Sequence, residues 1–347
     1  MAMTGRVSNR LTAGLRVAIL GVGRIGRMHA ELIAHQIDGL DVAIVHDVNA
    51  AAAADVGRRL GVAHTTDVDA VFGSDDVDVV AICSSTDTHV SLLMEAARCG
   101  KAIFCEKPIS LDLAQVDEAL AIVREAGVPI QIGFNRRFDP AHKSVRDAVA
   151  DGLLGDIHLV RITSRDPAPP PIEYIKVSGG IFLDMMIHDF DMARYVTGSE
   201  VVEVYAQGAV RVDAAIGEAG DVDTAAVMLR HDNGCITTID NSRQAVYGYD
   251  QRVEAFGSGG MAASDNPLAH SGVRRTAAGT AAPLLPFFFL DRYVPSYVAQ
   301  WAAFREYVDG GGVSPVSADD GRAPLVIGLA AWRSLREHRP VPTSEFT

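Results

Sequence analysis

The sequence predicts an α/β protein with two domains. The first is an N-terminal Rossmann domain on a doubly wound parallel sheet, and the second is a C-terminal α+β domain on an open, mostly antiparallel sheet. Short apolar strands alternate with helices over residues 16–134, as in parallel sheets. Later strands follow one another through hairpin turns such as Asp232-Asn233-Gly234, which indicates antiparallel pairing. We expect a disordered leader over 1–14, the Rossmann domain over 15–138 and the second domain over 139–347.

Composition narrows the class of partner. At 347 residues the chain has room for two domains. The net charge of -13 argues against a nucleic-acid partner, because phosphate-binding surfaces need a basic excess. No apolar run approaches the about 20 residues of a membrane span, so we expect no membrane partner. The four cysteines lack C-x-x-C spacing, which favours a reducing cytoplasm without disulfides or a zinc site. A small-molecule partner is therefore expected.

The first strand, residues 16–20, runs directly into a glycine-rich turn. Gly21-Val22-Gly23-Arg24-Ile25-Gly26 has G-x-G-x-x-G spacing between a strand and a helix, as the dinucleotide-binding fingerprint requires. Gly21 would make the tight turn, Gly23 would let the backbone approach a pyrophosphate, and Gly26 would allow close packing of helix on strand. Arg24 and Ile25 open the helix, whose N-terminus would face the phosphates.

Asp47 ends the second strand, residues 42–46, near the spacing expected for a ribose-binding acid. Its carboxylate would bond the adenosine ribose hydroxyls and repel a 2'-phosphate, so NAD is favoured over NADP. Asp47 could instead cap the helix predicted over residues 49–60, although Asn49 can serve that purpose equally well.

A buried parallel strand over residues 77–83 follows a short helix at 68–72. The end of this strand should line the cofactor crevice. Its hydroxyl and amide groups can meet the ribose and nicotinamide end of the cofactor, and the candidates are Ser84, Ser85, Thr86 and His89. For His89, a capping or packing role is at least as consistent with its place at the start of the next helix.

Glu106-Lys107-Pro108 follows the strand over residues 102–105 and lies at the same edge of the sheet. The ammonium group of Lys107 would there stabilise an oxygen that gains negative charge. A solvated surface lysine is the alternative. A helix over residues 110–126 and a strand over 129–134 complete this half.

The second half begins with a helix that Asp139 caps and Pro140 opens. Residues 167–171 form a proline-rich loop, and residues 271–286 show no clear period. Trp301, Phe304 and Val308 share one helical stripe and are expected in the core or at an interface. The sheet needs a partner if its outer face is apolar, so we expect a homo-oligomer. The predicted strands cover residues 157–164, 201–210, 224–230, 235–241 and 252–257, and the final helices cover 290–308 and 318–335.

Residues 179–195 are predicted to form one helix, which begins with a tight turn at two glycines. Asp184 and His188 stand four residues apart and would share one face. The carboxylate could hold the imidazole in one orientation and leave the far nitrogen free to take a proton near neutral pH. Such pairs are also common on exposed helix faces without any catalytic role.

Several of these runs resemble the glucose-fructose oxidoreductase and inositol dehydrogenase (Gfo/Idh/MocA) family, from about Arg16 to Pro342. The resemblance rests on the glycine-rich turn, on Glu106-Lys107-Pro108, on residues 133–140 and on the Asp184 to His188 helix. Further runs resemble the inositol dehydrogenase branch, at residues 164–167, 247–254, 259–261, 265–267 and 289–293.

The resemblance implies NAD-dependent oxidation of a ring hydroxyl of a cyclic polyol, myo-inositol above all, giving 2-keto-inosose (scyllo-inosose) in inositol catabolism. It implies that His188 is the general base, that Lys107 orients the reacting oxygen and that Asp184 bonds an adjacent hydroxyl. Glu106 and Lys107 would also contact the cofactor, and no metal is needed. The remaining hydroxyls would bind Arg137, Asp166 and Tyr249, in a dimer or tetramer. The alternatives are scyllo-inositol, another isomer or an aldose as substrate, or a cofactor-binding regulator that has lost catalysis.

Overall fold

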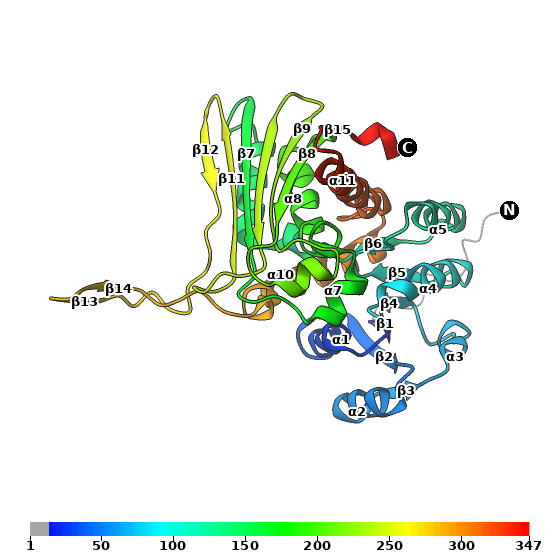
Figure 1. Cartoon of the computed structure of the whole chain (residues 1–347). Helices are drawn as coiled ribbons and strands as arrows, with labels where there is room; N and C mark the ends of the chain where they lie inside the picture. Colours follow the sequence, from blue (N-terminus) through cyan, green and yellow to red (C-terminus); the bar gives the residue numbers. More distant parts are fainter. Residues whose placement is uncertain (1–13, 347) are drawn as a thin grey trace. The chain divides into compact units, whose positions relative to one another are not determined.

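The computed structural model describes residues 14–346, which form two compact units (Figure 1). The first unit holds the described residues up to Gly133 together with Tyr297–Ala318, and the second holds Phe134–Ser296 and the described residues from Asp319 onward. The predicted leader lies outside the described residues, apart from Gly14.

The sheet of the first unit is six-stranded, in the order β3-β2-β1-β4-β5-β6. Every strand pair in it is parallel, as predicted for a Rossmann domain. The order reverses between β1 and β4, which is where such sheets bind dinucleotides at the carboxyl ends of their strands. The strands are β1 (Leu15–Leu20), β2 (Leu40–His46), β3 (Ala63–Thr65), β4 (Val79–Ile82), β5 (Ala102–Cys105) and β6 (Ile130–Ile132).

Polar side chains cap three of the helices described in this unit. Asn49 caps α2 and Asp67 caps α3. The predicted start of α5 at residue 110 is wrong, because Asp112 accepts the amides of Ala114 and Gln115 and starts the helix at Leu113. The helices are α1 (Arg24–Gln36), α2 (Ala50–Leu60), α3 (Val68–Phe72), α4 (Thr86–Arg98) and α5 (Leu113–Ala126).

Helix α10 (Phe289–Gly310) crosses the boundary between the units. Trp301 and Phe304 are fully buried in the core of the first unit, which confirms their expected place in a core. Trp301 stacks on Phe104 of β5, with ring centroids 4.3 Å apart. The two compact units therefore differ from the expected domains, which have a single boundary at residue 138. Tyr297–Ala318 belongs to the first unit because these aromatic rings are buried in its core.

The second unit contains a seven-stranded sheet, in the order β12-β11-β7-β10-β9-β8-β15. Only β7 and β10 pair in parallel among its described strands, so the prediction of a mostly antiparallel sheet is confirmed. The strands are β7 (Ile157–Arg165), β8 (Val201–Ala209), β9 (Thr224–His231), β10 (Ile236–Ser242), β11 (Asp250–Gly257), β12 (Gly260–Ala263) and β15 (Val341–Pro342).

Helices cover one face of this sheet, and their apolar side chains make one core with it. On the other face, side chains such as Leu159, Met228 and Phe256 are 44% to 50% exposed. Besides α10, the helical segments are η1 (Asn135–Phe138), α6 (Pro140–Ala150), α7 (Ile172–Ser178), η2 (Ile181–Met185), α8 (Ile187–Thr197), α9 (Ala214–Glu218), α11 (Ala318–Glu337) and η3 (Thr343–Phe346).

The segment without a predicted period, residues 271–286, contains a short ribbon of β13 (Arg274–Thr276) and β14 (Gly279–Ala281). Both strands are exposed along their whole length. Figure 1 shows the ribbon projecting beyond the sheet of the second unit.

All four cysteines lie in the described residues and carry free thiols. Within residues 14–346 we found no helix with the length and apolar character that membrane crossing requires.

Candidate active site

The glycine-rich turn has a geometry that requires glycine at positions 21 and 26. Gly21 adopts a φ of +87°, and a Cβ there would lie 2.5 Å from the Cα of Ser84. A Cβ on Gly26 would lie 1.8 Å from the carbonyl oxygen of Gly21. Gly23, by contrast, has open space where its Cβ would stand. A ligand can therefore approach the backbone at Gly23 while Gly21 and Gly26 hold strand and helix together.

The first turn of α1 presents its amide groups without a side-chain cap. The N-cap is Gly23, and the first turn carries no acidic residue. Arg24 is exposed and Ile25 is half-buried. Uncapped amides and the positive end of the helix dipole favour an anion, so this turn fits a pyrophosphate group.

Asp47 braces the same turn from the end of β2. Its Oδ2 accepts the amide of Val22 at 2.8 Å, and its Oδ1 accepts the amide of Asn49 at 2.8 Å. The cap of α2 is Asn49, whose Oδ1 accepts the amides of Ala51 and Ala52. Asp47 therefore does not cap that helix, and a carboxylate has further lone pairs for ribose hydroxyls.

The loop after β4 contains Ser84, Ser85 and Thr86 at the start of α4. The hydroxyl oxygens of Ser84 and Thr88 lie 2.6 Å apart. The ring of His89 is buried between two carbonyl oxygens, those of Pro108 at 2.9 Å and Ser84 at 3.1 Å. These contacts favour the packing role for His89, because its ring joins the loops after β4 and β5.

Glu106 and Lys107 follow β5 at the same edge of the sheet. The carboxylate of Glu106 accepts the amide of Lys107 at 3.2 Å and lies 2.9 Å from the imidazole of His29. Lys107 is half-buried. A Cβ on Gly133 would lie 2.9 Å from the carboxyl carbon of Glu106, so glycine at that position leaves room for the carboxylate.

In the second unit, the predicted continuous helix over residues 179–195 is wrong. Gly179 and Gly180 have φ values of +86° and +76°, and they separate α7 from a single π-helical turn, η2. The amide of Met186 bonds the carbonyl of Ile181 at 2.8 Å, five residues back, and α8 starts at Ile187. Such π turns are frequent at functional sites.

Contacts from remote segments hold this π turn. Asp221 Oδ1 accepts the amide of Ile181 at 3.0 Å, and the guanidinium of Arg243 lies 3.5 Å from both Asp221 and Asp184. Asp184 also accepts the hydroxyl of Tyr174 at 2.8 Å. Arg243 is almost completely buried. The carboxylate of Asp184 is therefore held by groups that sequence spacing did not reveal.

His188 lies at the start of α8 and is half-buried. Its Nδ1 atom is buried, and its ring meets the ring of Phe134 edge to face, with centroids 5.9 Å apart. Asp184 lies on the π turn just before it. Helical spacing alone did not reveal the break between these two residues.

Arg136, which sequence reasoning missed, interacts electrostatically with both Asp166 and Tyr249. Its guanidinium donates to Asp189 at 2.7 Å and to the hydroxyl of Tyr249 at 3.5 Å, and all three groups are buried. Burial raises the pKa of Asp166 to about 6, although Arg136 and Arg243 oppose the rise. The only sequence signal for Arg136 was its position next to Arg137.

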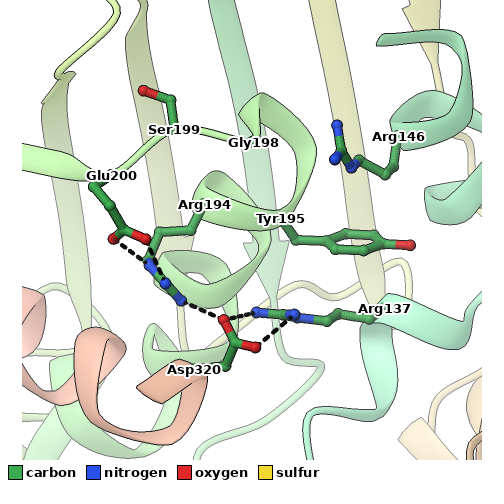
Figure 2. Close-up of a pocket in the computed structure, with 8 residues that line it drawn as sticks. All are labelled: Arg137, Arg146, Arg194, Tyr195, Gly198, Ser199, Glu200 and Asp320. Atoms are coloured by element: carbon green, nitrogen blue, oxygen red, sulfur yellow. Dashed lines mark hydrogen bonds and ion pairs between the residues drawn. The ribbon is translucent and has the colours of Figure 1, made fainter. Parts of the chain in front are cut away.

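Arg137 is bound by carboxylates instead. Its guanidinium donates to Asp191 at 2.6 Å and to Asp320 at 3.2 Å. These pairs lie at a pocket of about 350 Å³, where Figure 2 shows the ring of Tyr195 between Arg146 and Arg137. The contacts favour a role for Arg137 in joining η1, α8 and α11.

The doubly wound sheet and its glycine-rich turn define an NAD-binding oxidoreductase domain. A family model described as "Oxidoreductase family, NAD-binding Rossmann fold" matches residues 15–134, and the GFO/IDH/MocA C-terminal domain model matches residues 142–263. The chain belongs to the Gfo/Idh/MocA oxidoreductase family. NAD is its cofactor. Within residues 14–346 no group of three His, Cys, Asp or Glu side chains could hold a metal ion.

Relatives match the chain over nearly its full length. It is 47% identical to a myo-inositol 2-dehydrogenase of Thermotoga maritima, covering 95% of this chain and 99% of that protein. It is 45% identical to an inositol 2-dehydrogenase of Rhizobium meliloti, covering 94% and 98%. A crystal structure of scyllo-inositol dehydrogenase from Lactobacillus casei, with bound NAD(H) and scyllo-inositol, superposes with a TM-score of 0.89 at 28% identity, covering 95% and 99%.

Proposed function

We propose that this chain oxidises the axial hydroxyl of myo-inositol to 2-keto-inosose, with NAD as the hydride acceptor. The observation that carries the proposal is the 47% identity to a myo-inositol 2-dehydrogenase over 95% of the chain. The buried polar groups of the second unit support it, because a polyol without charge must be recognised through many hydrogen bonds, each contributing about 1 kcal/mol.

His188 is the proposed general base, which takes the proton of the reacting hydroxyl. Its Nδ1 is buried, so we propose that Nε2 is the nitrogen that accepts this proton. Bound NAD supplies the hydride acceptor at C4 of the nicotinamide. The hydride leaves the carbon as the hydroxyl proton passes to His188, and the products are a ketone and NADH.

Lys107 is proposed to orient the same oxygen and to stabilise its developing negative charge. Asp184 is proposed to bond an adjacent hydroxyl, with its carboxylate held by Tyr174 and Arg243. Asp166 and Tyr249 are proposed to bind further hydroxyls beside Arg136. Arg137 is the weakest of the proposed substrate contacts, because two carboxylates already bind its guanidinium.

For the cofactor, we propose that the uncapped turn of α1 holds the pyrophosphate and that Asp47 bonds the adenosine ribose. The proposed contacts are Gly21, Gly23, Arg24, Ile25, Gly26, Asp47, Ser84, Ser85, Thr86, Glu106 and Lys107, with His89 holding two of the loops together. Asp47→Ala should reduce the preference for NAD over NADP, because the variant no longer repels a 2'-phosphate. A preference that stays unchanged in steady-state rates with both cofactors would contradict this role.

Scyllo-inositol is the alternative substrate, supported by the similarity to the Lactobacillus casei enzyme. Another inositol isomer or an aldose fits the same family. The deciding experiment measures absorbance of the reduced cofactor over myo-inositol, scyllo-inositol and glucose, each with NAD and with NADP. If myo-inositol gives no NADH while another polyol does, the substrate assignment fails and the dehydrogenase class stands.

Two variants test the residue roles. We expect Lys107→Ala and His188→Asn each to lower kcat by at least about 100-fold, the usual minimum for losing a proton-transfer or charge-stabilising group. NAD affinity, measured by calorimetry, should stay near the wild-type value for His188→Asn. Undiminished turnover of Lys107→Ala would overturn the catalytic assignment of Lys107. A wild-type protein that binds NAD but oxidises no polyol would instead fit a cofactor-binding regulator that has lost catalysis.

We also propose a homo-oligomer, a tetramer or a dimer, that covers the open face of the second sheet. Exposed apolar side chains lie side by side there, because Phe256 pairs with both Leu159 and Met261, and Met228 pairs with Tyr205. Phe256→Glu should shift the mass measured by light scattering towards the monomer. The free thiols fit the proposed cytoplasmic location.

A further inference from the structure

A chain of hydrogen bonds in the first unit runs from α10 to the backbone of Lys107. The indole N–H of Trp301 donates to Nδ1 of His29 at 2.9 Å. Nε2 of His29 lies 2.9 Å from Oε1 of Glu106, and the amide of Lys107 donates to Oε2 at 3.2 Å. These hydrogen bonds therefore link three separate segments: α10, α1 and the end of β5.

The chemistry of the partners sets the direction of these bonds. An indole nitrogen only donates, so Nδ1 of His29 accepts. The proton of the neutral imidazole is then on Nε2, which donates to Glu106. The carboxylate of Glu106 accepts at both oxygens, once from His29 and once from Lys107. Each of the three hydrogen bonds therefore has one donor and one acceptor in a single tautomer of His29.

The surroundings restrict movement of this chain. His29 and Trp301 are fully buried, and Glu106 is nearly so. The ring of His29 meets the edges of Phe104, Tyr297 and Trp301 at centroid distances of 5.3 to 5.6 Å. Because aromatic rings close the site, water cannot easily replace a lost partner, and a buried polar group without one is costly.

We propose that Trp301, His29 and Glu106 are positioning residues for Lys107. They hold its backbone at the end of β5, and so they set where its ammonium group can reach. Neither Trp301 nor His29 needs to touch substrate or cofactor to do this. The inference rests on the proposed function for the catalytic role of Lys107, whereas the hydrogen bonds themselves do not depend on it.

The test removes the donor and keeps an aromatic ring, with Trp301→Phe. We expect the amide hydrogen of Lys107 to exchange about tenfold faster and kcat to fall about tenfold, with a smaller change in KM. Val56→Ala is the control, because Val56 lies in the same buried core as Trp301 and its apolar side chain takes no part in these hydrogen bonds. It should lower the melting temperature and leave both the exchange of Lys107 and kcat unchanged.

Glu106→Gln provides a second comparison. If Trp301 acts through Glu106, Trp301→Phe should have little additional effect on kcat in the Glu106→Gln background. Additive effects, or equal effects of Trp301→Phe and Val56→Ala on exchange, would overturn the proposal. If the wild-type protein oxidises no polyol, the proposed function fails, and the exchange rate of Lys107 still decides whether the chain of hydrogen bonds positions it.

Discussion

Removing Arg136 should expose how strongly the second unit depends on its buried ion pair. Its guanidinium lies 2.7 Å from Asp189, and the two side chains are 7% and 0% exposed. Arg136→Met leaves that carboxylate buried without its cation, which typically costs about 3 to 5 kcal/mol. The bond from Asn241 to Asp189, at 2.8 Å, remains in the variant. We therefore expect a loss of about 3 kcal/mol, the lower end of that range.

Lys143→Met is the matched control in the same unit. Nζ of Lys143 lies 2.7 Å from Oδ2 of Asp147, the same distance as in the buried pair, but these two side chains are 55% and 50% exposed. Exposed pairs contribute about 0 to 1 kcal/mol, because water screens them. The two variants thus separate the effect of burial from the effect of distance.

Urea unfolding followed by tryptophan fluorescence provides the assay. The chain has two tryptophans, Trp301 in the first unit and Trp332 in the second. The indole of Trp332 donates to the carbonyl of Gly179 at 3.2 Å, so its emission reports on the second unit near the π turn. Equal losses for Arg136→Met and Lys143→Met would refute the argument from burial.

Three further predictions concern single positions. The pKa of Asp166 is raised from 3.8 to about 6, so the folded state binds this proton more tightly than the unfolded state. Its contribution to stability is fully present below pH 3.8 and is lost as the pH rises to 6, and Asp166→Asn should remove that fall from thermal melts in this range. Gly23→Ala should fold normally, since nothing lies within 4 Å of the new Cβ, yet bind NAD at least about tenfold more weakly in calorimetry, because the methyl group occupies the path of the pyrophosphate. Asn49→Ala should cost the first unit about 1 kcal/mol in urea unfolding through loss of the cap of α2, and a loss within error would contradict the capping role.

Local sequence patterns were sufficient for most of the fold. The glycine-rich turn predicted the β1-α1 junction, because Gly21 adopts a positive φ there and a Cβ on Gly26 would meet the carbonyl oxygen of Gly21. Asp139 and Pro140 predicted the start of α6, and Asp139 indeed accepts two amides of its first turn. These features depend on neighbours within a few residues, which a sequence displays directly.

The features that sequence reasoning missed depend on distant partners. A π turn and an α-helix place apolar residues at similar intervals, and the turn at Ile181 is held by Asp221 and Arg243, which lie far along the chain. Likewise, no local pattern separates Arg136, which lies beside Tyr249, from its neighbour Arg137. Their partners decide between them, and those come from separate strands and helices.

The return of α10 to the first unit has a consequence for the order of folding. The indole of Trp301 and the ring of His29 are 272 residues apart in sequence, and the loop between them contains most of the second unit. During synthesis, the Rossmann strands emerge first but lack Trp301 and Phe304 until almost the whole chain has been made. Contacts of such long separation slow folding, because the loop must close before they form. We expect a nascent or truncated chain that ends at residue 138 to expose Phe104 and to need a chaperone, and the amide of Lys107 to become protected only in the last step of folding.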